Sequence, residues 1–458
     1  MTLALIQDEI FRAYDIRGIV DEGLNTEVMC WLGKAIGSEA LDNGDKRLLL
    51  GSDARLSSPA YVEHMNNGIL ATGCDVIDLG QIPTPLLYFA THNLDVHSGV
   101  MITGSHNPKN YNGVKIVFQH QSLNDSQIAV FKKRIKSNDF HIGEGKLQHF
   151  SIKEAYIQHI LNDIKLKHPW KVIIDCGNAI TANVAPDLFS MLGCDITTLF
   201  SELDGTFPNH HPDPTVAENL IDLIDRVKTE NADLGIAFDG DRVVLVSGSG
   251  MIIDADQLLM TFVKDILPQN EGATVVFDVK SSLHINALVK DFQGIPQMCK
   301  SGHSFVKKAM ADSVALIGGE YSSHIFLKHR WFGFDDGIYG ATRFLELMDK
   351  NNTTADDLIQ SLPSSVNTSE LFIAPPEIQK FTLMKILARE FHLEGSAINE
   401  LDGIRASFDF GWGLIRASNT TPNLVLRFEA TDENALQQIK DLFRNEITRI
   451  LPHLSLPF

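Results

Sequence analysis

The sequence predicts an α/β protein with three similar α/β domains followed by a smaller C-terminal α+β domain. One observation is a strand–helix–strand plan that occurs three times along the chain. Another is a change of pattern in the last part of the chain, where short strands precede one long amphipathic helix. The length of 458 residues also exceeds what one hydrophobic core usually supports.

The repeated plan begins with apolar strands that reach an Asp near their ends, at 47–53, 171–178 and 274–280. A helix-length segment follows each of them. Second strands are expected at 73–80, 193–200 and 294–300, and third strands at 99–107, 234–242 and 314–322. Each third strand leads into a Gly-containing polar loop. Ligands of such sheets bind beyond the carboxyl ends of the strands, so these loops are the candidate binding elements.

The C-terminal pattern predicts antiparallel strands at 404–410, 413–418 and 423–430, followed by a helix at 433–451. Helical spacing places five apolar residues on one face of that helix: Leu436, Ile439, Phe443, Ile447 and Ile450. The polar, Pro-containing segment 362–377 is expected to be the linker into this domain. We expect domains at 1–150, 151–252, 253–365 and 366–458.

The composition is that of an ordinary globular protein, with 44% hydrophobic and 21% charged residues. The formal charge of −19 disfavours binding to nucleic acid or to anionic membranes. Five cysteines form no CxxC pair, and neither a secretory signal nor an 18-residue apolar run is found. These features predict a reduced, cytoplasmic protein, in which a polyanionic ligand must meet local clusters of Arg and Lys.

The stretch Ser98–Lys115, SGVMITGSHNPKNYNGVK, carries the strongest chemical signal. An apolar strand ends at Thr103-Gly104 and delivers Ser105 onto a loop that Pro108 restricts. A glycine next to the hydroxyl leaves room for a ligand. An ordinary turn has the same residue types, so the local pattern alone leaves both interpretations open.

This loop resembles the phosphoserine loop of the α-D-phosphohexomutases, the superfamily of bacterial-type phosphomannomutases and phosphoglucomutases. Further similar motifs are FRAYDIRG (11–18), PTP (83–85), FPNHHPDPT (207–215), SGHSFVK (301–307), DDGI (335–338) and GWGLIRASNTTPNLVLRFEA (411–430). The resemblance implies mixed sheets in the first three domains and four domains around a central cleft. It also implies that Ser105 carries the phosphoryl group.

The metal candidate is Asp239-Gly240-Asp241-Arg242, which follows an apolar strand. Taken alone, this pattern is more often a capped turn. The resemblance implies that Ser105, Asp239 and Asp241 bind Mg²⁺, the ion suited to carboxylate and phosphate oxygens. The family pattern, DGDGDR, has a third aspartate and two more residues, so we expect weaker Mg²⁺ binding here. Four residues also replace family glycines, which would strain any position with positive φ. These residues are Ala54, Ser58, Ala179 and Ser323.

The resemblance implies two groups of substrate-binding residues. Glu320 and Ser322 would bind sugar hydroxyls, and they would project to one side if their segment were extended. The pattern Arg416–Thr420 gathers donors for the phosphate that is not transferred, namely Arg416, Ser418, Asn419 and Thr420. Without the resemblance, Glu320 reads as a solvated loop carboxylate. The RASNT pattern favours the mannose/glucose branch over phosphoglucosamine mutases.

Further residues in matched motifs supply positive charge or orientation. The cations Arg17, Lys115 and Arg242 are expected in catalysis, with Lys115 as an acid or base and His106 orienting its neighbours. Tyr14, Lys280 and His303 are expected to bind substrate, although a lone His in SGHS more often caps a helix.

The expected activity is the interconversion of hexose 1-phosphate and 6-phosphate, of mannose or glucose, through phosphoserine and a bisphosphorylated sugar. The resemblance implies Mg²⁺ and a hexose 1,6-bisphosphate activator, and a monomer or weak dimer whose small-molecule partner is a phosphosugar. Two alternatives stay open: a metal-impaired, non-catalytic sugar-phosphate-binding relative, and a phosphatase acting through the same serine. A Ser-His hydrolase is disfavoured because Ser105 lacks the second glycine of GxSxG.

Overall fold

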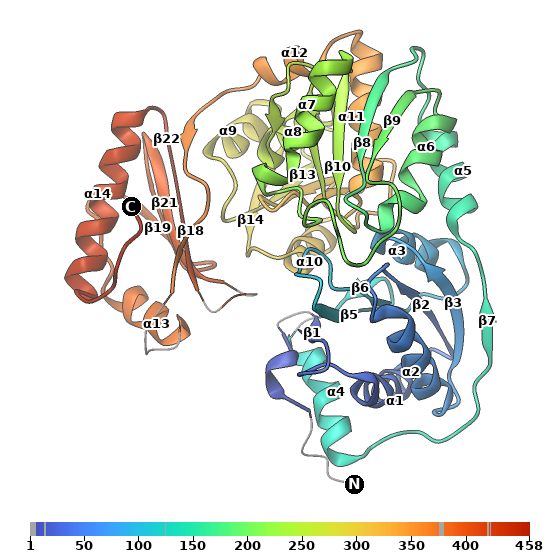
Figure 1. The fold of residues 1–458 in the computed structure, drawn as a ribbon. Helices are drawn as coiled ribbons and strands as arrows, with labels where there is room; N and C mark the ends of the chain where they lie inside the picture. Colours follow the sequence, from blue (N-terminus) through green and yellow to red (C-terminus); the bar gives the residue numbers. More distant parts are fainter. Residues whose placement is uncertain (1–5, 13–14, 124, 375–379, 419–420, 422) are drawn as a thin grey trace. The chain divides into compact units, whose positions relative to one another are not determined.

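The computed structural model describes residues 6–12, 15–123, 125–374, 380–418, 421 and 423–458 (Figure 1). The chain divides into two compact units. The first unit comprises Met1–Ala255 and Ser322–Ile359, and the second comprises Asp256–Tyr321 and Gln360–Phe458.

The first sheet of the first unit has the strand order β1-β5-β4-β2-β3-β7, with β6 paired to β5. Its strands are β1 (Ile16–Ile19), β2 (Arg47–Ser52), β3 (Asp75–Gln81), β4 (Gly99–Ile102), β5 (Tyr111–Phe118), β6 (Gln121–Ser122) and β7 (Leu147–His149). Its helices are α1 (Thr26–Asp42), α2 (Ser58–Leu70), α3 (Thr84–Asn93) and α4 (Asp125–Ser137). Strand β2 is parallel to β3 and β4, whereas β5 is antiparallel to β4. The sheet is therefore mixed.

The second sheet of this unit has the order β12-β11-β10-β8-β9. The strands are β8 (Lys171–Asp175), β9 (Asp195–Leu199), β10 (Leu234–Phe238), β11 (Val243–Ser247) and β12 (Ile252–Ile253). The helices along this part of the chain are α5 (Lys153–Asp163), α6 (Ala185–Met191) and α7 (Ile221–Glu230). The later segment of the unit adds β16 (Ile325–Leu327) and α11 (Gly337–Asn351), and α11 packs on β10 and β11. Helix α12 (Ala355–Gln360) follows.

The second unit contains a parallel group in which β13 (Thr274–Asp278) lies between β14 (Ile295–Cys299) and β15 (Ile317–Gly319). Its helices are α8 (Ala255–Ile266), α9 (Leu283–Asp291) and α10 (His303–Ser313). The C-terminal sheet has the order β17-β22-β21-β20-β19, with β18 paired to β22. It consists of β17 (Val366–Asn367), β18 (Leu371–Ile373), β19 (Ala397–Asn399), β20 (Ile404–Phe408), β21 (Gly411–Ala417) and β22 (Leu424–Ala430). Helices α13 (Lys380–Glu390) and α14 (Glu433–Ile450) complete it.

The structure confirms the predicted fold class. The three strands of each repeat align with the same spatial order, in which the first strand lies between the second and the third. The C-terminal sheet is antiparallel, and Ile439, Phe443 and Ile447 of α14 are buried in its core. The expected linker 362–377 was wrong in part. It supplies β17 and β18, because their backbone groups pair with the edge of β22.

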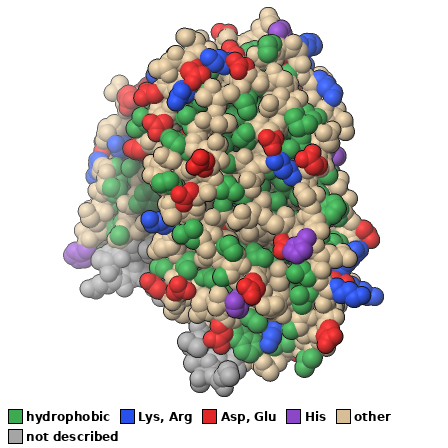
Figure 2. Space-filling model, turned by 45° about the vertical axis from the view of Figure 1, so that its right-hand side comes forward, with side chains coloured by type: hydrophobic (Ala, Val, Ile, Leu, Met, Phe, Trp, Pro, Cys, Tyr) green, Lys and Arg blue, Asp and Glu red, His purple; other side chains and the backbone are tan. Residues whose placement is uncertain are grey.

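The surface shows no concentration of one charge on the face drawn in Figure 2, where acidic and basic side chains are interspersed. No helix in the described part of the chain is both long and apolar enough to cross a membrane.

Candidate active site

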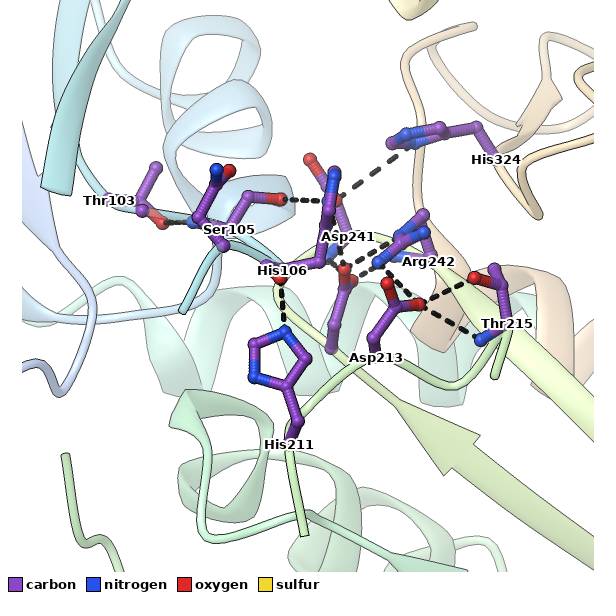
Figure 3. Close-up of polar contacts among 12 residues, drawn as sticks. Thr103, Ser105, His106, His211, Asp213, Thr215, Asp241, Arg242 and His324 are labelled. Carbon is purple, nitrogen blue, oxygen red and sulfur yellow. Dashed lines mark hydrogen bonds and ion pairs between the residues drawn. The ribbon is translucent and has the colours of Figure 1, made fainter. Parts of the chain in front are cut away.

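Ser105 lies on the loop that follows β4, and its backbone has a φ of 49°, in the left-handed region (Figure 3). Its amide donates to Thr103 Oγ1 at 2.9 Å, and its Oγ lies 3.2 Å from His106 Nδ1. A non-glycine residue in this conformation costs about 1–2 kcal/mol, so surrounding contacts must hold it. The loop therefore presents the Ser105 hydroxyl in a conformation that the chain would not adopt alone.

Arg55 supplies those contacts. Its guanidinium donates to four backbone carbonyls of the loop, those of Ser105 (2.7 Å), Asn107 (2.6 Å), Pro108 (2.7 Å) and Tyr111 (2.9 Å). The side chain is only 1% exposed and pairs with Asp53 Oδ2, which also accepts a hydrogen bond from the amide of Gly104 at 3.0 Å. A Cβ at Gly104 would lie 2.4 Å from Arg55 Nε, so this position needs glycine. We call residues 103–111, which join β4 to β5, the serine loop. It is folded around one buried cation, Arg55.

Asp239 follows β10, and both of its carboxylate oxygens accept hydrogen bonds. Oδ1 accepts from the amides of Asp241 (2.8 Å) and Arg242 (2.7 Å), and Oδ2 accepts from Arg242 Nε at 2.7 Å. Arg242 also reaches Asp213 Oδ1 at 3.1 Å, and Asp213 in turn accepts from Thr215 (Figure 3). His106 Nδ1 lies 4.0 Å from Asp239 Oδ2. These contacts join the serine loop to the DGDR loop.

Asp241 is the acidic centre of this region. Its Oδ2 pairs with Lys115 Nζ of β5, and its Oδ1 is buried and accepts no hydrogen bond from the described residues. That oxygen lies 4.0 Å from His324 Nδ1, which is 3.4 Å from Asp335 Oδ2. One ligand atom from each of Asp241, His324 and Asp335 lies within 4.8 Å of the others. This buried group suggests a metal cofactor, because carboxylate and imidazole are common ligands of divalent cations.

The pKa values in this region keep the cations charged and the carboxylate ionised. Burial would lower the pKa of Lys115, but Asp241 and Asp335 outweigh it and raise the pKa. Burial disfavours the Asp241 carboxylate, but Lys115 and His324 hold its pKa well below the ordinary range. The pKa of His106 is lowered, first by burial and then by Arg242 and Arg17. Lys115 is therefore a protonated donor in this state.

Arg17 is another cation of the first unit and lies on β1. It donates to the Asn107 side chain and pairs with Asp15 at 2.6 Å. Arg17, Lys115 and Arg242 are each less than a tenth exposed. Three buried cations that bind the loops of Ser105 and Asp239–Arg242 provide a suitable environment for an anionic group.

The second unit holds most of the expected substrate-binding residues. Arg416 Nη2 pairs with Asp402 at 2.9 Å, and the amide of Ser301 donates to the same carboxylate oxygen. Lys280 Nζ lies 3.2 Å from Glu370, and carboxylates including Glu370 outweigh burial to raise the Lys280 pKa. Three further expected residues are buried. His303 begins α10, Glu320 lies 3.4 Å from Ser301 Oγ, and Ser418 Oγ accepts a hydrogen bond from the amide of Thr421.

Comparison with known proteins places the chain in a family. The four domains described for phosphoglucomutase/phosphomannomutase match in order: alpha/beta/alpha domain I at 8–141, domain II at 154–250, domain III at 254–366 and the C-terminal domain at 376–446. The chain belongs to the phosphoglucomutase/phosphomannomutase family.

Full-length relatives of this family support the assignment. A phosphomannomutase/phosphoglucomutase of Pseudomonas aeruginosa is 47% identical over 98% of this chain and 97% of its own length. A phosphoglucomutase of Neisseria gonorrhoeae is 42% identical over 99% of this chain and 100% of its own. A family protein of Burkholderia thailandensis has a crystal structure with a TM-score of 0.94 and 39% identity, covering 99% of this chain and 100% of its own.

Three expected site residues lie outside the described part of the chain, and the structure changes one argument about two others. Tyr14, Asn419 and Thr420 lie outside the described residues. Glu320 is assigned to the second unit and Ser322 to the first, and the segment around them is a turn. The alternation argument, which required an extended segment, therefore does not apply to Glu320 and Ser322.

Four site residues were missing from the sequence prediction: Arg55, Asp213, His324 and Asp335. Each lies in a segment that resembles the family, namely DARLSSP, FPNHHPDPT, EYSSH and DDGI. A signal was present, because charged residues and histidine in matched motifs are candidates for binding. Asp213 lies 29 positions from Arg242, and His324 lies 83 positions from Asp241, so the sequence pattern alone could not pair them.

The replaced family glycines have different consequences. Ser323 has a φ of 68°, so the expected strain is present there. Ala54, Ser58 and Ala179 do not have positive φ, so the condition for strain is not met at these positions. Ser58 begins α2, and Ala179 has a φ of −96°.

Proposed function

We propose that this protein is a phosphohexomutase that interconverts hexose 1-phosphate and hexose 6-phosphate, of mannose or glucose, with Ser105 as the phosphoryl carrier. The observation that carries the proposal is the serine loop itself. Ser105 is held in a left-handed conformation by Arg55. Buried Arg17 binds Asn107 of the same loop, and buried Arg242 and Lys115 bind the two aspartates of the DGDR loop. The names of the full-length relatives support the same activity.

In the first half-reaction, the free hydroxyl of the sugar attacks the phosphorus of phospho-Ser105. An O–P bond to the sugar forms, the bond from phosphorus to Oγ breaks, and a hexose 1,6-bisphosphate results. After reorientation, Ser105 Oγ attacks the other phosphate and regenerates phosphoserine. Phosphoryl transfer depends mainly on positioning and charge neutralisation, which the Arg17, Arg242 and Lys115 cations supply.

Proton transfer in this scheme uses two groups of the first unit. The raised pKa of Lys115 favours donation of its proton to the departing Ser105 Oγ, rather than the role of base in the first half-reaction. The proton of the attacking hydroxyl needs an acceptor, and His324, beside Asp241 and Asp335, would accept it only in its neutral form. Lys115 acts as the base in the reverse direction, once it has lost its proton.

A divalent cation fits this site through Asp241. Its buried Oδ1 accepts no hydrogen bond from the described residues, whereas both oxygens of Asp239 are already occupied. We propose Mg²⁺ as the ion, with Asp241 as its principal ligand and Ser105 and Asp239 as the other expected ones. When bound, Mg²⁺ would neutralise charge on the phosphoryl oxygens. The short DGDR loop predicts weak binding, because ligand charge is a main determinant of affinity for hard cations.

The metal assignment is tested by calorimetric titration with Mg²⁺, and with Mn²⁺ followed by electron paramagnetic resonance. Asp241→Asn should abolish binding under conditions that saturate the unmodified protein. Asp239→Asn separates the two ligand sets. A large loss of metal affinity in Asp239→Asn would support Asp239 and Asp241 as the ligand pair. A small loss in Asp239→Asn, together with a large loss in Asp335→Asn, would instead assign the ion to Asp241, His324 and Asp335.

In the second unit, Arg416 and Ser418, with Asn419 and Thr420, are proposed to bind the phosphate that is not transferred. Lys280, His303 and Glu320, with Tyr14 and Ser322, are proposed to bind the rest of the sugar phosphate. The domain boundaries at 150, 252 and 365, a hexose 1,6-bisphosphate activator, a cytoplasmic location and a monomeric or weakly dimeric state belong to the same proposal.

The central test is incubation with glucose 1,6-bisphosphate, followed by intact-mass and peptide analysis. One phosphate should appear on Ser105, and Ser105→Ala should lose both the phosphate and the conversion of mannose or glucose 1-phosphate to the 6-phosphate. The exposed Ser137→Ala variant is the control and should keep both. Phosphate on another residue, together with an active Ser105→Ala variant, would disprove the assignment.

A metal-impaired relative is the second candidate, and the occupied oxygens of Asp239 favour it. The same assay distinguishes the alternatives. Sugar-phosphate binding without turnover at any Mg²⁺ concentration would identify a binding protein. Release of inorganic phosphate instead of 6-phosphate would identify a phosphatase.

A further inference from the structure

The turn from Val279 to Leu283, which joins β13 to α9 and carries Lys280, is held by side chains of the C-terminal sheet. We call it the lysine loop. Three consecutive carbonyls of this loop accept hydrogen bonds from two arginines. Arg405 of β20 donates to Val279 O and, at 3.0 Å, to Ser281 O, and Arg427 of β22 donates to Lys280 O. Both arginines are less than 5% exposed.

Donors of the same loop meet an acidic residue. Glu429 of β22 accepts from Ser282 Oγ at 2.6 Å and from the amide of Leu283 at 3.1 Å. The C-terminal sheet thus offers cations to the loop carbonyls and a carboxylate to the loop donors. Each hydrogen bond involves a charged group, which makes it stronger than a neutral one.

Aromatic rings keep these charged groups in place. The Arg405 guanidinium lies 3.8 Å from the centre of the Trp412 ring, and that of Arg427 lies 3.7 Å from the centre of the Tyr321 ring. Trp412 donates to Glu429 Oε2 at 2.7 Å and is only 1% exposed. Cation–π contacts gain strength when they are shielded from water, as these are.

We propose that Arg405, Arg427 and Glu429 are positioning residues for substrate binding, which act by fixing the backbone on both sides of Lys280. The proposal rests on the proposed function, in which Lys280 binds the sugar phosphate. Arg427 also stacks on Tyr321, the neighbour of Glu320, so one side chain supports both substrate-binding segments. Lys280 Nζ itself is not a partner of these residues, since it pairs with Glu370.

A purely stabilising role explains the arrangement less well. Buried ion pairs stabilise proteins no better than apolar side chains of similar volume, because desolvation offsets much of their attraction. Here the charged hydrogen bonds converge on one short loop, which is the expected pattern when a loop conformation must be specified. The charge is retained: burial lowers the pKa of Arg405 only to about 10, with Glu429 opposing the shift.

The test measures equilibrium binding of glucose 1-phosphate by calorimetry to the full-length protein, together with KM and kcat. Arg427→Lys and Glu429→Gln should each raise Kd and KM about 10-fold and leave kcat within about 3-fold. The tryptophan emission of Arg405→Lys should also shift, since Trp412 loses its guanidinium neighbour. Ile439→Val, a change in the core of the same sheet away from the lysine loop, controls for mild destabilisation and should leave Kd unchanged.

A double-mutant cycle with Lys280→Ala decides the mechanism. Glu429 contacts the lysine loop at Ser282 and Leu283, so Glu429→Gln should cost no further affinity in the Lys280→Ala background. Arg427→Lys should keep only the part of its loss that acts through Tyr321 and Glu320. The positioning role would be overturned if the fold-increases in Kd of Glu429→Gln and Lys280→Ala multiplied in the double variant. It would also be overturned if Ile439→Val raised Kd as much as Arg427→Lys does. Glu429→Gln has nearly the same shape as the original residue and keeps the test open if an arginine variant fails to fold. An unmodified protein that binds no glucose 1-phosphate would reject the proposed function, and this inference with it.

Discussion

The serine loop of the first unit and the lysine loop of the second unit are both held by buried arginine side chains, but in different ways. Each follows a strand of a repeated α/β plan, and each has carbonyls that accept hydrogen bonds from buried guanidinium groups. In the serine loop one residue, Arg55, serves four carbonyls and comes from the same sheet region, just after β2. In the lysine loop two arginines and a glutamate come from a different sheet.

The difference indicates which changes each loop tolerates. A loop that depends on one cation should fail in a single step, whereas a loop that depends on three charged residues should lose its conformation gradually. The serine loop also carries backbone strain at Ser105, which the lysine loop does not have at Lys280. The loop proposed to react covalently is therefore the more tightly constrained one.

The largest expected effect is that of Arg55→Met. Four carbonyls and Asp53 lose their partner in a buried setting, so the free energy of unfolding should fall by about 3–5 kcal/mol. Arg405→Met should cost less, because Arg427 and Glu429 still hold the lysine loop. Urea unfolding followed by circular dichroism measures both. An equal fall in the free energy of unfolding in the two variants would contradict the claim that the serine loop depends more strongly on a single cation.

Arg416→Ala should weaken the binding of sugar phosphates by about 1.5–3 kcal/mol, the range for a hydrogen bond to a charged group. Asp402 would lose its partner as well, so the unfolding free energy must be measured alongside. Calorimetric titration with glucose 1-phosphate and glucose 6-phosphate is the measurement. Unchanged affinity for either isomer would argue against one site that holds both phosphates.

Acid should destabilise the first unit through His92. Burial, then His120 and His97, lower the pKa of His92 to about 4, and its ring stacks on that of His120 at 4.2 Å. Between pH 6.5 and 4 the unfolded chain binds a proton that the folded one does not, so stability falls as pH falls through this window. Although its ring packs against neighbouring rings, His92 keeps more than a third of its surface exposed to solvent, which screens the effect to about 1 kcal/mol or less.

Unfolding free energies of the unmodified protein and of His92→Gln, measured from pH 7 to pH 4, test this expectation. The slope against pH should be smaller in the variant. Trp412 is the tryptophan of the second unit, so its emission in a variant lacking Trp31, Trp170 and Trp331 reports that unit separately. A His92-dependent change seen equally by Trp412 would show that the two units do not unfold independently.

The smallest expected effect is a gain from Ser323→Gly. With a φ of 68°, Ser323 is strained, and glycine should raise the unfolding free energy by about 0.5–1 kcal/mol. The matched control is Ala179→Gly, where φ is −96° and the same change should destabilise. A thermal melt of each variant is sufficient, and opposite signs are expected. If both variants were more stable than the unmodified protein, relief of backbone strain at Ser323 would not explain the gain in stability.

The sequence by itself determined the repeated α/β plan, the C-terminal α+β domain and the serine loop. These features depend on local patterns, because strand and helix periods and turn residues are properties of short segments. The tertiary structure decided which charges meet. Lys115 and Asp241 lie 126 positions apart, and Arg427 lies 147 positions from Lys280, so only the packing of their strands joins them. It also decided which replaced glycines carry strain, because φ depends on how each turn fits its surroundings: Ser323 is forced into the left-handed region, and Ala179 is not.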